Sequence, residues 1–238
     1  MKKENQEKID KFIKTIESFN VVGQEKEDAL YLEYYYNSLM ELDDESLKKD
    51  TAYAVDEERA ERAYCNDVSK EYHCLLKQKN PFGLRIDAED TKHMILSKGE
   101  PSPWKFPDLI VHGGRNNTEK QKQMVVCEAK RFSILSSQNF LDDLNKLLEF
   151  SGNTIWKGNG FKYAVFLLIG GSSDKLSERI KTVFSNQECE LENLYDCSKQ
   201  TVRFLDFLNA HRDDLSKIIV FVHRAVKDVE MLLLGDII

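Results

Sequence analysis

Three charged residues, Asp108, Glu128 and Lys130, combine side-chain types and a spacing that could support hydrolytic chemistry. Asp108 lies in the apolar segment 106–112, and Glu128 and Lys130 lie near the end of the apolar segment 123–132. Both segments are short, contain β-branched residues and are flanked by polar residues, a pattern typical of buried strands. Alternate side chains of a strand share one face, so we expect Glu128 and Lys130 to project together.

The residues between these two segments, 113–122, are polar and rich in turn-forming types, which favours a hairpin. A hairpin places the start of one strand beside the end of the other, and so gathers Asp108, Glu128 and Lys130 at one point. Two converging carboxylates form a hard oxygen site suited to Mg²⁺ or Mn²⁺. Such an ion can polarise a phosphodiester and activate a water, while a lysine can orient that water or stabilise developing charge.

The dipeptide Pro107-Asp108 and the tripeptide Glu128-Ala129-Lys130 resemble the signature of the PD-(D/E)xK nuclease superfamily, which has the restriction-endonuclease-like fold. The resemblance implies that Asp108 and Glu128 bind the metal ion, with the Ala129 carbonyl completing its shell, and that Lys130 positions the attacking water. A second interpretation stays open, in which Glu128 and Lys130 form an ordinary surface salt bridge at the end of a strand.

A helix is predicted over residues 56–78, which contain good helix formers and neither Gly nor Pro. Glu61 falls near the centre of its apolar stripe, where a carboxylate needs a partner or a polar cavity. In branches of the same superfamily, the helix before the first core strand donates a further acid, so the resemblance makes Glu61 an additional metal-binding and catalytic residue. Alternatively, Glu61 pairs with a basic residue near the helix end. The stripe consists of Cys65, Val68, Tyr72 and Leu75.

The predicted elements follow the order α-β-β-β-α-β, which is the core order of the superfamily. The resemblance therefore implies an α/β fold in which a mixed central sheet is flanked by helices, and it covers residues 56–170. The elements are a helix over 56–78, strands over 83–90, 107–112 and 123–132, a helix over 139–150 and a strand over 162–169.

The two ends of the chain carry less information. Residues 1–50 are predicted to form a helical N-terminal extension, and residues 51–238 the nuclease-like domain. The apolar tail, 229–238, is expected to dock on the body or on a partner. A homodimer could form through the N-terminal helices or through this tail. The predicted elements at the ends are helices over 4–20, 24–42, 176–184 and 200–210, and a strand over 217–223.

Composition agrees with an α/β protein of ordinary size. The chain has 238 residues, of which 41% are hydrophobic, enough to bury a sizeable core. No apolar run approaches ~20 residues and the first residues are charged, so we expect no membrane partner, no signal peptide and a cytoplasmic location. The five cysteines lack the spacing of a standard structural zinc site.

Net charge is the main argument against a nucleic-acid partner. The chain carries a formal charge of −7, whereas nucleic-acid binders usually present a basic surface. The segment 98–131 nevertheless contains seven basic residues against four acids, and two of these acids are the expected metal ligands. We therefore expect a Mg²⁺-dependent or Mn²⁺-dependent nuclease acting on DNA. The alternative is a catalytically silent, nuclease-like binding module.

Overall fold

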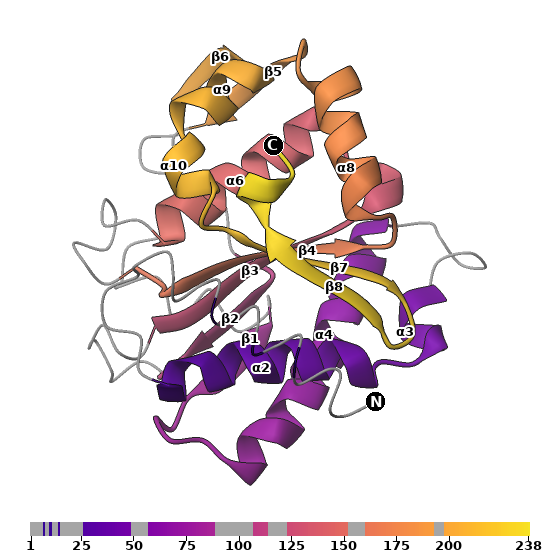
Figure 1. The fold of residues 1–238 in the computed structure, drawn as a ribbon, viewed down its shortest axis with the longest axis vertical. Helices are drawn as coiled ribbons and strands as arrows, with labels where there is room; N and C mark the ends of the chain where they lie inside the picture. The colour runs from indigo at the N-terminus through magenta and orange to yellow at the C-terminus, as the bar shows by residue number, and fades with distance from the viewer. Residues whose placement is uncertain are drawn as a thin grey trace.

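A six-stranded mixed sheet forms the centre of the computed structural model, with helices on both of its faces (Figure 1). The predicted α/β class, with a mixed sheet between helices, is thereby confirmed. Among the helices that can be described, none combines the length and apolar character needed to cross a lipid bilayer. The structure describes residues 26–48, 57–88, 107–113, 123–151, 160–192 and 198–238, together with Glu7, Asp10 and Lys14.

The strands are arranged in the order β1-β2-β3-β4-β7-β8. Neighbours are antiparallel from β1 to β3, parallel from β3 through β4 to β7, and antiparallel again between β7 and β8. The carboxyl ends of β3, β4 and β7 consequently lie at one end of the sheet. The first residue of β2 lies near the same end. The strands are β1 (Arg85–Ala88), β2 (Leu109–His112), β3 (Gln123–Arg131), β4 (Tyr163–Ile169), β7 (Ile219–Ala225) and β8 (Asp228–Leu233).

The expected antiparallel pairing of β2 with β3 is confirmed, with Leu109 opposite Cys127. The residues that connect the two strands, 114–122, lie outside the described residues. Within the described part of the chain, the predicted core order is observed as α4, β1, β2, β3, α6 and β4.

Among the described residues, the lower face of the sheet in Figure 1 is covered by α2 (Lys26–Glu41), α3 (Asp44–Lys48) and α4 (Glu57–Gln78). The tyrosines of α2 are buried between α4 and the sheet, and the Tyr35 hydroxyl lies 2.9 Å from the Cys127 sulfur. The aromatic run of α2 therefore packs the core. Most of the predicted helix over 4–20 and the predicted domain boundary at residue 50 lie outside the described residues.

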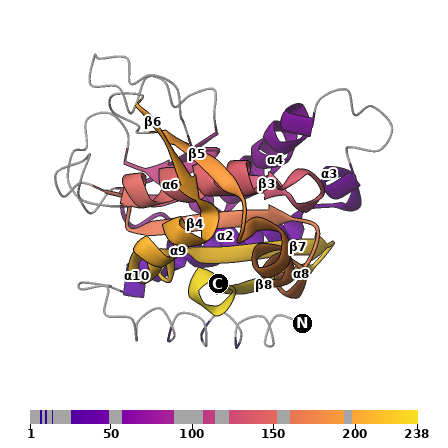
Figure 2. The same ribbon diagram turned by 90° about the horizontal axis from the view of Figure 1, so that it is seen from above.

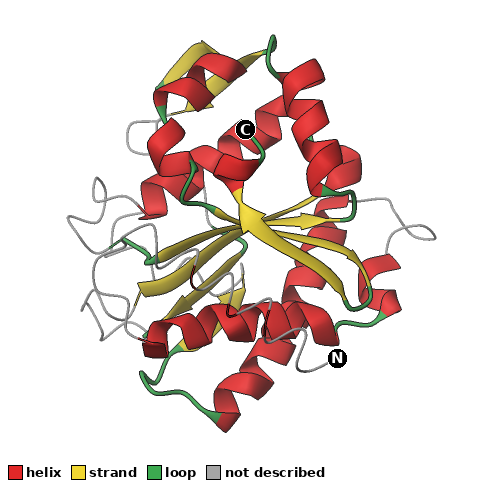
Figure 3. Ribbon diagram, viewed as in Figure 1, coloured by secondary structure: helices red, strands yellow, loops and turns green. Residues whose placement is uncertain are grey.

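The opposite face is covered chiefly by α6 (Ser137–Ser151), which connects the parallel strands β3 and β4 and runs alongside them (Figure 2). Its apolar stripe, including Phe140, Leu144 and Leu147, is buried against the sheet. Figure 3 shows the helices of this layer above the yellow strands. The layer also contains α8 (Ser173–Arg179), a π-helical turn (Ile180–Phe184), α9 (Phe204–Ala210), α10 (Arg212–Leu215) and a ribbon of β5 (Glu188–Glu192) and β6 (Lys199–Arg203).

The predicted helix over 200–210 is wrong in its first part, because Lys199–Arg203 is strand β6 and only Phe204–Ala210 is helical. β6 contains the β-branched Thr201 and Val202 and pairs with β5, which the sequence did not predict. Tertiary pairing outweighs the helical pattern here.

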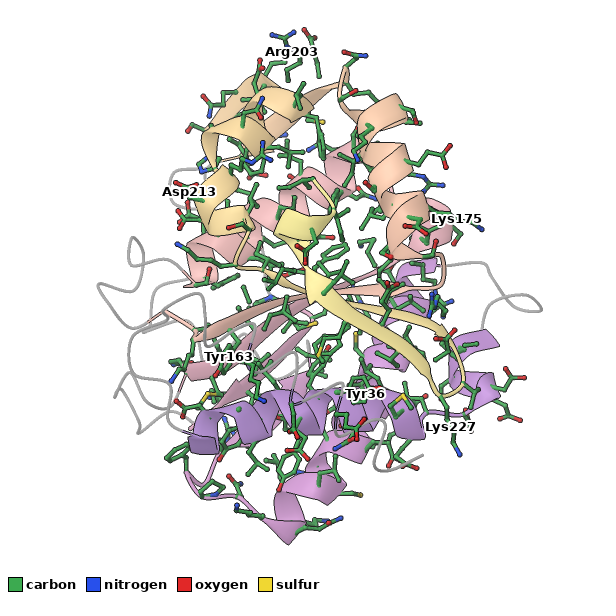
Figure 4. The ribbon with its side chains drawn as sticks, viewed as in Figure 1. Tyr36, Tyr163, Lys175, Arg203, Asp213 and Lys227 are labelled. Atoms are coloured by element: carbon green, nitrogen blue, oxygen red, sulfur yellow. The ribbon has the colours of Figure 1, made fainter. Side chains whose placement is uncertain are left out.

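The C-terminal tail docks on the body as edge strand β8, after a turn in which Lys227 has a φ of 60° (Figure 4). Leu233, Leu234 and Ile237 are buried within the chain itself. The homodimer stays a prediction, and the described apolar residues of this tail already have an intramolecular role.

Candidate active site

Two hydrogen bonds fix Asp108 near the carboxyl end of β3, one through its backbone N–H and one through its carboxylate. Its backbone N–H donates to the Cys127 carbonyl at 2.9 Å, and its Oδ2 accepts from the Ala129 N–H at 2.7 Å. The first bond continues the pairing of β2 with β3, and the second fastens the carboxylate to the tripeptide Glu128-Ala129-Lys130. The hairpin therefore joins the two halves of the sequence motif directly.

Glu128 projects toward α6, where it contacts Lys146, and Lys130, two residues further along β3, shares its face of the strand as the spacing predicts. Val126, two residues before Glu128, lies in the same buried cluster as the apolar residues of α6, whereas Cys127 and Ala129 lie in the buried cluster that contains the apolar residues of α2 and α4. Glu128 is only 1% exposed, so it does not form the surface salt bridge with Lys130 that composition alone allowed.

Glu61 is buried on α4 and binds the end of β3 with both carboxylate oxygens. Its Oε1 accepts the Arg131 N–H at 3.0 Å, and its Oε2 accepts from Lys130 Nζ at 3.0 Å. The basic partner of Glu61 is therefore the lysine of the motif rather than a residue at the end of its own helix. The structure brings Glu61 to the same strand end as the other three predicted site residues.

Two further charged residues of the site, Asp143 and Lys146, come from α6 and were not predicted. Lys146 Nζ donates to Glu128 Oε2 at 2.5 Å and lies 3.0 Å from Asp143 Oδ1. Asp143 is buried between the apolar residues Phe140 and Leu144 of the α6 stripe. A buried acid in an apolar stripe is the signal that pointed to Glu61, and applied to α6 it would have found Asp143.

Burial and like charges govern the acids of this cluster. Burial raises the pKa of Glu128 well above its ordinary value, and Asp108 and Asp143 add to the effect, while Lys146 opposes it. The pKa of Asp143 is also raised by burial, against the opposing effect of Lys146 and Lys130. Burial raises the pKa of Glu61 too, partly offset by Lys130 and the Arg131 N–H.

The pKa values of the two lysines are raised even though burial acts to lower them. Burial by itself lowers the pKa of Lys146, but Glu128, Asp143 and Asp108 outweigh it and raise that pKa well above the ordinary value. The pKa of Lys130 is likewise raised, because Asp143, Glu61 and Asp108 outweigh its burial. Both lysines therefore stay charged, and the cluster as a whole holds four carboxyl groups against two ammonium groups.

The donors at this strand end fit a hard divalent cation in their chemistry. Among the described residues, no group of three or more acids, histidines or cysteines is arranged to hold a metal ion. Mg²⁺, however, is often bound by one or two carboxylates, with water and substrate phosphate as its other ligands. Glu128 Oε1 and Asp143 Oδ2 are both buried and accept no hydrogen bond from the described residues, so each retains capacity for a cation.

No family model, no curated protein and no solved structure matches this chain.

Proposed function

We propose that the chain is a metal-dependent nuclease of the PD-(D/E)xK type, with a restriction-endonuclease-like core, and that it hydrolyses phosphodiester bonds in DNA. The observation that carries the proposal is the 2.7 Å hydrogen bond between the Ala129 N–H and Asp108, which joins the two halves of the motif. A chance occurrence of the two short motifs would not require their carboxylate and tripeptide to be in contact.

In this proposal Asp108 and Glu128 hold Mg²⁺ or Mn²⁺, and the Ala129 carbonyl is a further candidate ligand. The N–H and C=O of one strand residue point to the same side, so the Ala129 carbonyl faces the side on which Asp108 accepts its N–H. A bound cation would polarise the phosphodiester and supply a nucleophilic water. Asp108 is positioned by β3 itself, which limits the reorganisation that binding requires.

Lys130 has the role of orienting the attacking water and stabilising charge on the phosphorus. Its ammonium group is held by Glu61, and its raised pKa keeps it charged at neutral pH. Glu61 in turn is fixed by the Arg131 N–H, so it holds the lysine in one position. A charged group that is already positioned costs little reorganisation during the reaction, which is the usual source of electrostatic catalysis.

A DNA substrate is favoured by the charge of one segment rather than of the whole chain. Residues 98–131, which include the motif, carry seven basic residues, and a bound cation would add positive charge to them. Phosphate contacts by lysine and arginine supply most of the affinity for a nucleic-acid backbone.

A second candidate function is a catalytically silent binding module with the same fold. The observation that favours it is the ion pair between Lys146 and Glu128, which gives the buried acid a counter-charge without any metal. The two functions differ in cation binding, because a nuclease requires the divalent ion and a silent module does not.

The test is a cleavage assay in Mg²⁺ or Mn²⁺ on linear, circular, single-stranded and branched DNA, with RNA as a further substrate. The matched variants are Lys130→Ala, which removes the proposed water-positioning group, and Lys70→Ala, which removes a lysine whose side chain is 73% exposed. We expect cleavage by the wild type and Lys70→Ala, and its loss in Lys130→Ala. Equal activity in all three proteins would contradict the proposal.

A further inference from the structure

The role of Lys146 and Asp143 is not explained by the two sequence motifs. The Lys146 ammonium group lies between Glu128 Oε2, at 2.5 Å, and Asp143 Oδ1, at 3.0 Å. It is a cation bridging two buried carboxylates, and its side chain is only 13% exposed. Such a bridge stabilises two acids that would otherwise be buried side by side without a counter-charge.

Each of these two acids also has a second oxygen that Lys146 does not use. Glu128 Oε1 and Asp143 Oδ2 are buried, and neither accepts a hydrogen bond within the described part of the chain. Their side chains are 1% and 6% exposed, so bulk water does not readily solvate these oxygens. A buried carboxylate oxygen without a partner is costly, and the cost is relieved by a ligand that binds both acids.

The charge balance indicates what kind of ligand this is. Glu61 pairs with Lys130, which also interacts with Asp143 and Asp108, while Lys146 interacts with Glu128, Asp143 and Asp108. Four carboxylates and two ammonium groups leave an excess of negative charge. A divalent cation that replaced Lys146 would balance these acids better than one ammonium group does, and it would accept more oxygen ligands.

Resting on the proposed function, we propose that Asp143 is a third ligand of the divalent cation and that Lys146 occupies the cation position in the metal-free protein. Cation binding then requires the ammonium group to leave and the carboxylates to close in. Ligands of Mg²⁺ lie ~2.1 Å from the ion, closer than either oxygen lies to the Lys146 nitrogen.

The first experiment measures Mn²⁺ affinity by calorimetry at pH 8, where protons compete least for the carboxylates. Asp143→Asn should weaken binding by roughly tenfold or more, because it replaces a charged ligand by a neutral amide. Lys146→Met should tighten binding by about tenfold or more, because it removes the competing internal cation. The controls are Asp142→Asn, one residue away on α6, and Lys70→Met on the exposed side of α4, and both should match the wild type.

The second experiment needs no variant and therefore holds even if Lys146→Met fails to fold. Wild-type protein is treated with an amine-acylating reagent, with and without saturating Mn²⁺, and each lysine is quantified by mass spectrometry. Lys146 should be protected without metal and should gain reactivity severalfold when Mn²⁺ binds, with Lys70 as an internal reference. Unchanged labelling of Lys146 in protein saturated with Mn²⁺ would overturn the proposed displacement.

The two proposals fail in different ways. If wild type binds Mn²⁺ and Asp108→Asn abolishes binding, but Asp143→Asn has no effect, the nuclease site stands and the role of Asp143 is wrong. If wild type does not bind Mn²⁺ at all, the metal-dependent function fails, and the displacement of Lys146 fails with it.

Discussion

The carboxylate of Glu61 on α4 accepts a hydrogen bond from Lys130 Nζ on β3 at 3.0 Å, across a separation of 69 residues in the sequence. The same carboxylate accepts the N–H of Arg131, so Glu61 is held by the strand whose lysine it positions. A helix on one face of the sheet therefore controls a side chain that projects from the other face. This relationship makes Glu61 a positioning residue for Lys130, in addition to its predicted contribution to the metal site.

Glu61→Gln should separate activity from stability. Glutamine keeps an oxygen for the Arg131 N–H but loses the charge that holds Lys130, so the lysine becomes mobile. We expect nuclease activity to fall about a hundredfold, since misplacement by ~1 Å can cost that much. The free energy of unfolding should fall by no more than about 3 kcal/mol, because Lys130 keeps Asp143 and Asp108 as counter-charges when it loses Glu61.

Glu71→Gln, on the same helix, is the control for this experiment and should keep full activity. Steady-state cleavage rates and urea unfolding of both variants provide the measurements. A Glu61→Gln protein as active as the wild type would show that the contact with Lys130 is not needed for catalysis.

Asp108→Asn should abolish cation binding without unfolding the protein. Asparagine keeps an acceptor for the Ala129 N–H, so the junction between β2 and β3 survives while the charged ligand is lost. We expect the dissociation constant for Mn²⁺ to rise by more than roughly a hundredfold. Calorimetry measures the affinity, and a thermal melt followed by circular dichroism checks the fold. Unchanged affinity in the folded variant would remove Asp108 from the metal site.

Much of the fold could be predicted because its central segments carry strong local patterns. The fully buried strand Tyr163–Ile169 is a continuous apolar run, and α6 shows a clear helical stripe. The elements that were missed are those whose conformation depends on pairing. β5 (Glu188–Glu192) alternates three glutamates with Cys189 and Leu191 but is only five residues long, and four of the five residues of β6 are exposed. Their pairing with each other is a tertiary contact that a local window does not contain.

The site was predictable where residues lie close in sequence and less so where they meet through packing. Asp108 directly precedes β2, and Glu128 and Lys130 lie on the adjacent strand β3, so a hairpin suffices to bring them together. Asp143 and Lys146 reach the site only because α6 crosses back over β3. The charges of Asp143 and Lys146 on an apolar helix were visible in the sequence. Which strand this helix would pack against depended on the strand order of the sheet.

The stability of the metal-free protein should fall as the pH rises through the range in which Glu128 ionises. Burial, with Asp108 and Asp143, raises the pKa of Glu128 above its ordinary value of 4.5, so the folded state binds this proton more tightly than the unfolded chain does. The stabilisation is therefore fully present below pH 4.5 and is lost as the pH rises through the folded-state pKa. Glu128→Gln removes this contribution, so the variant should gain stability relative to the wild type as the pH rises.

Urea unfolding in EDTA at several values between pH 5 and pH 8 measures this difference. Repeating the wild-type series in saturating Mn²⁺ should reverse the trend, because metal ligands must be deprotonated. A difference between the two proteins that does not vary with pH would contradict the buried, ionising role of Glu128.

Gly170 and Gly171 follow β4 at the same end of the sheet as the candidate site. Both have positive φ values, 77° and 72°, but their surroundings differ. A Cβ at Gly171 would lie 2.5 Å from Cγ of Phe132, the residue that follows β3, whereas a Cβ at Gly170 would meet no atom within 4 Å. Gly170→Ala should therefore cost about 1–2 kcal/mol from backbone strain alone. Gly171→Ala should cost a further 1–3 kcal/mol, roughly, because the Phe132 ring must shift. Urea unfolding of the two variants isolates the contact, since the backbone strain is common to both. Equal destabilisation would mean that the Phe132 ring moves at little energetic cost. The end of β3 beside Lys130 would then be less rigidly packed than the structure indicates.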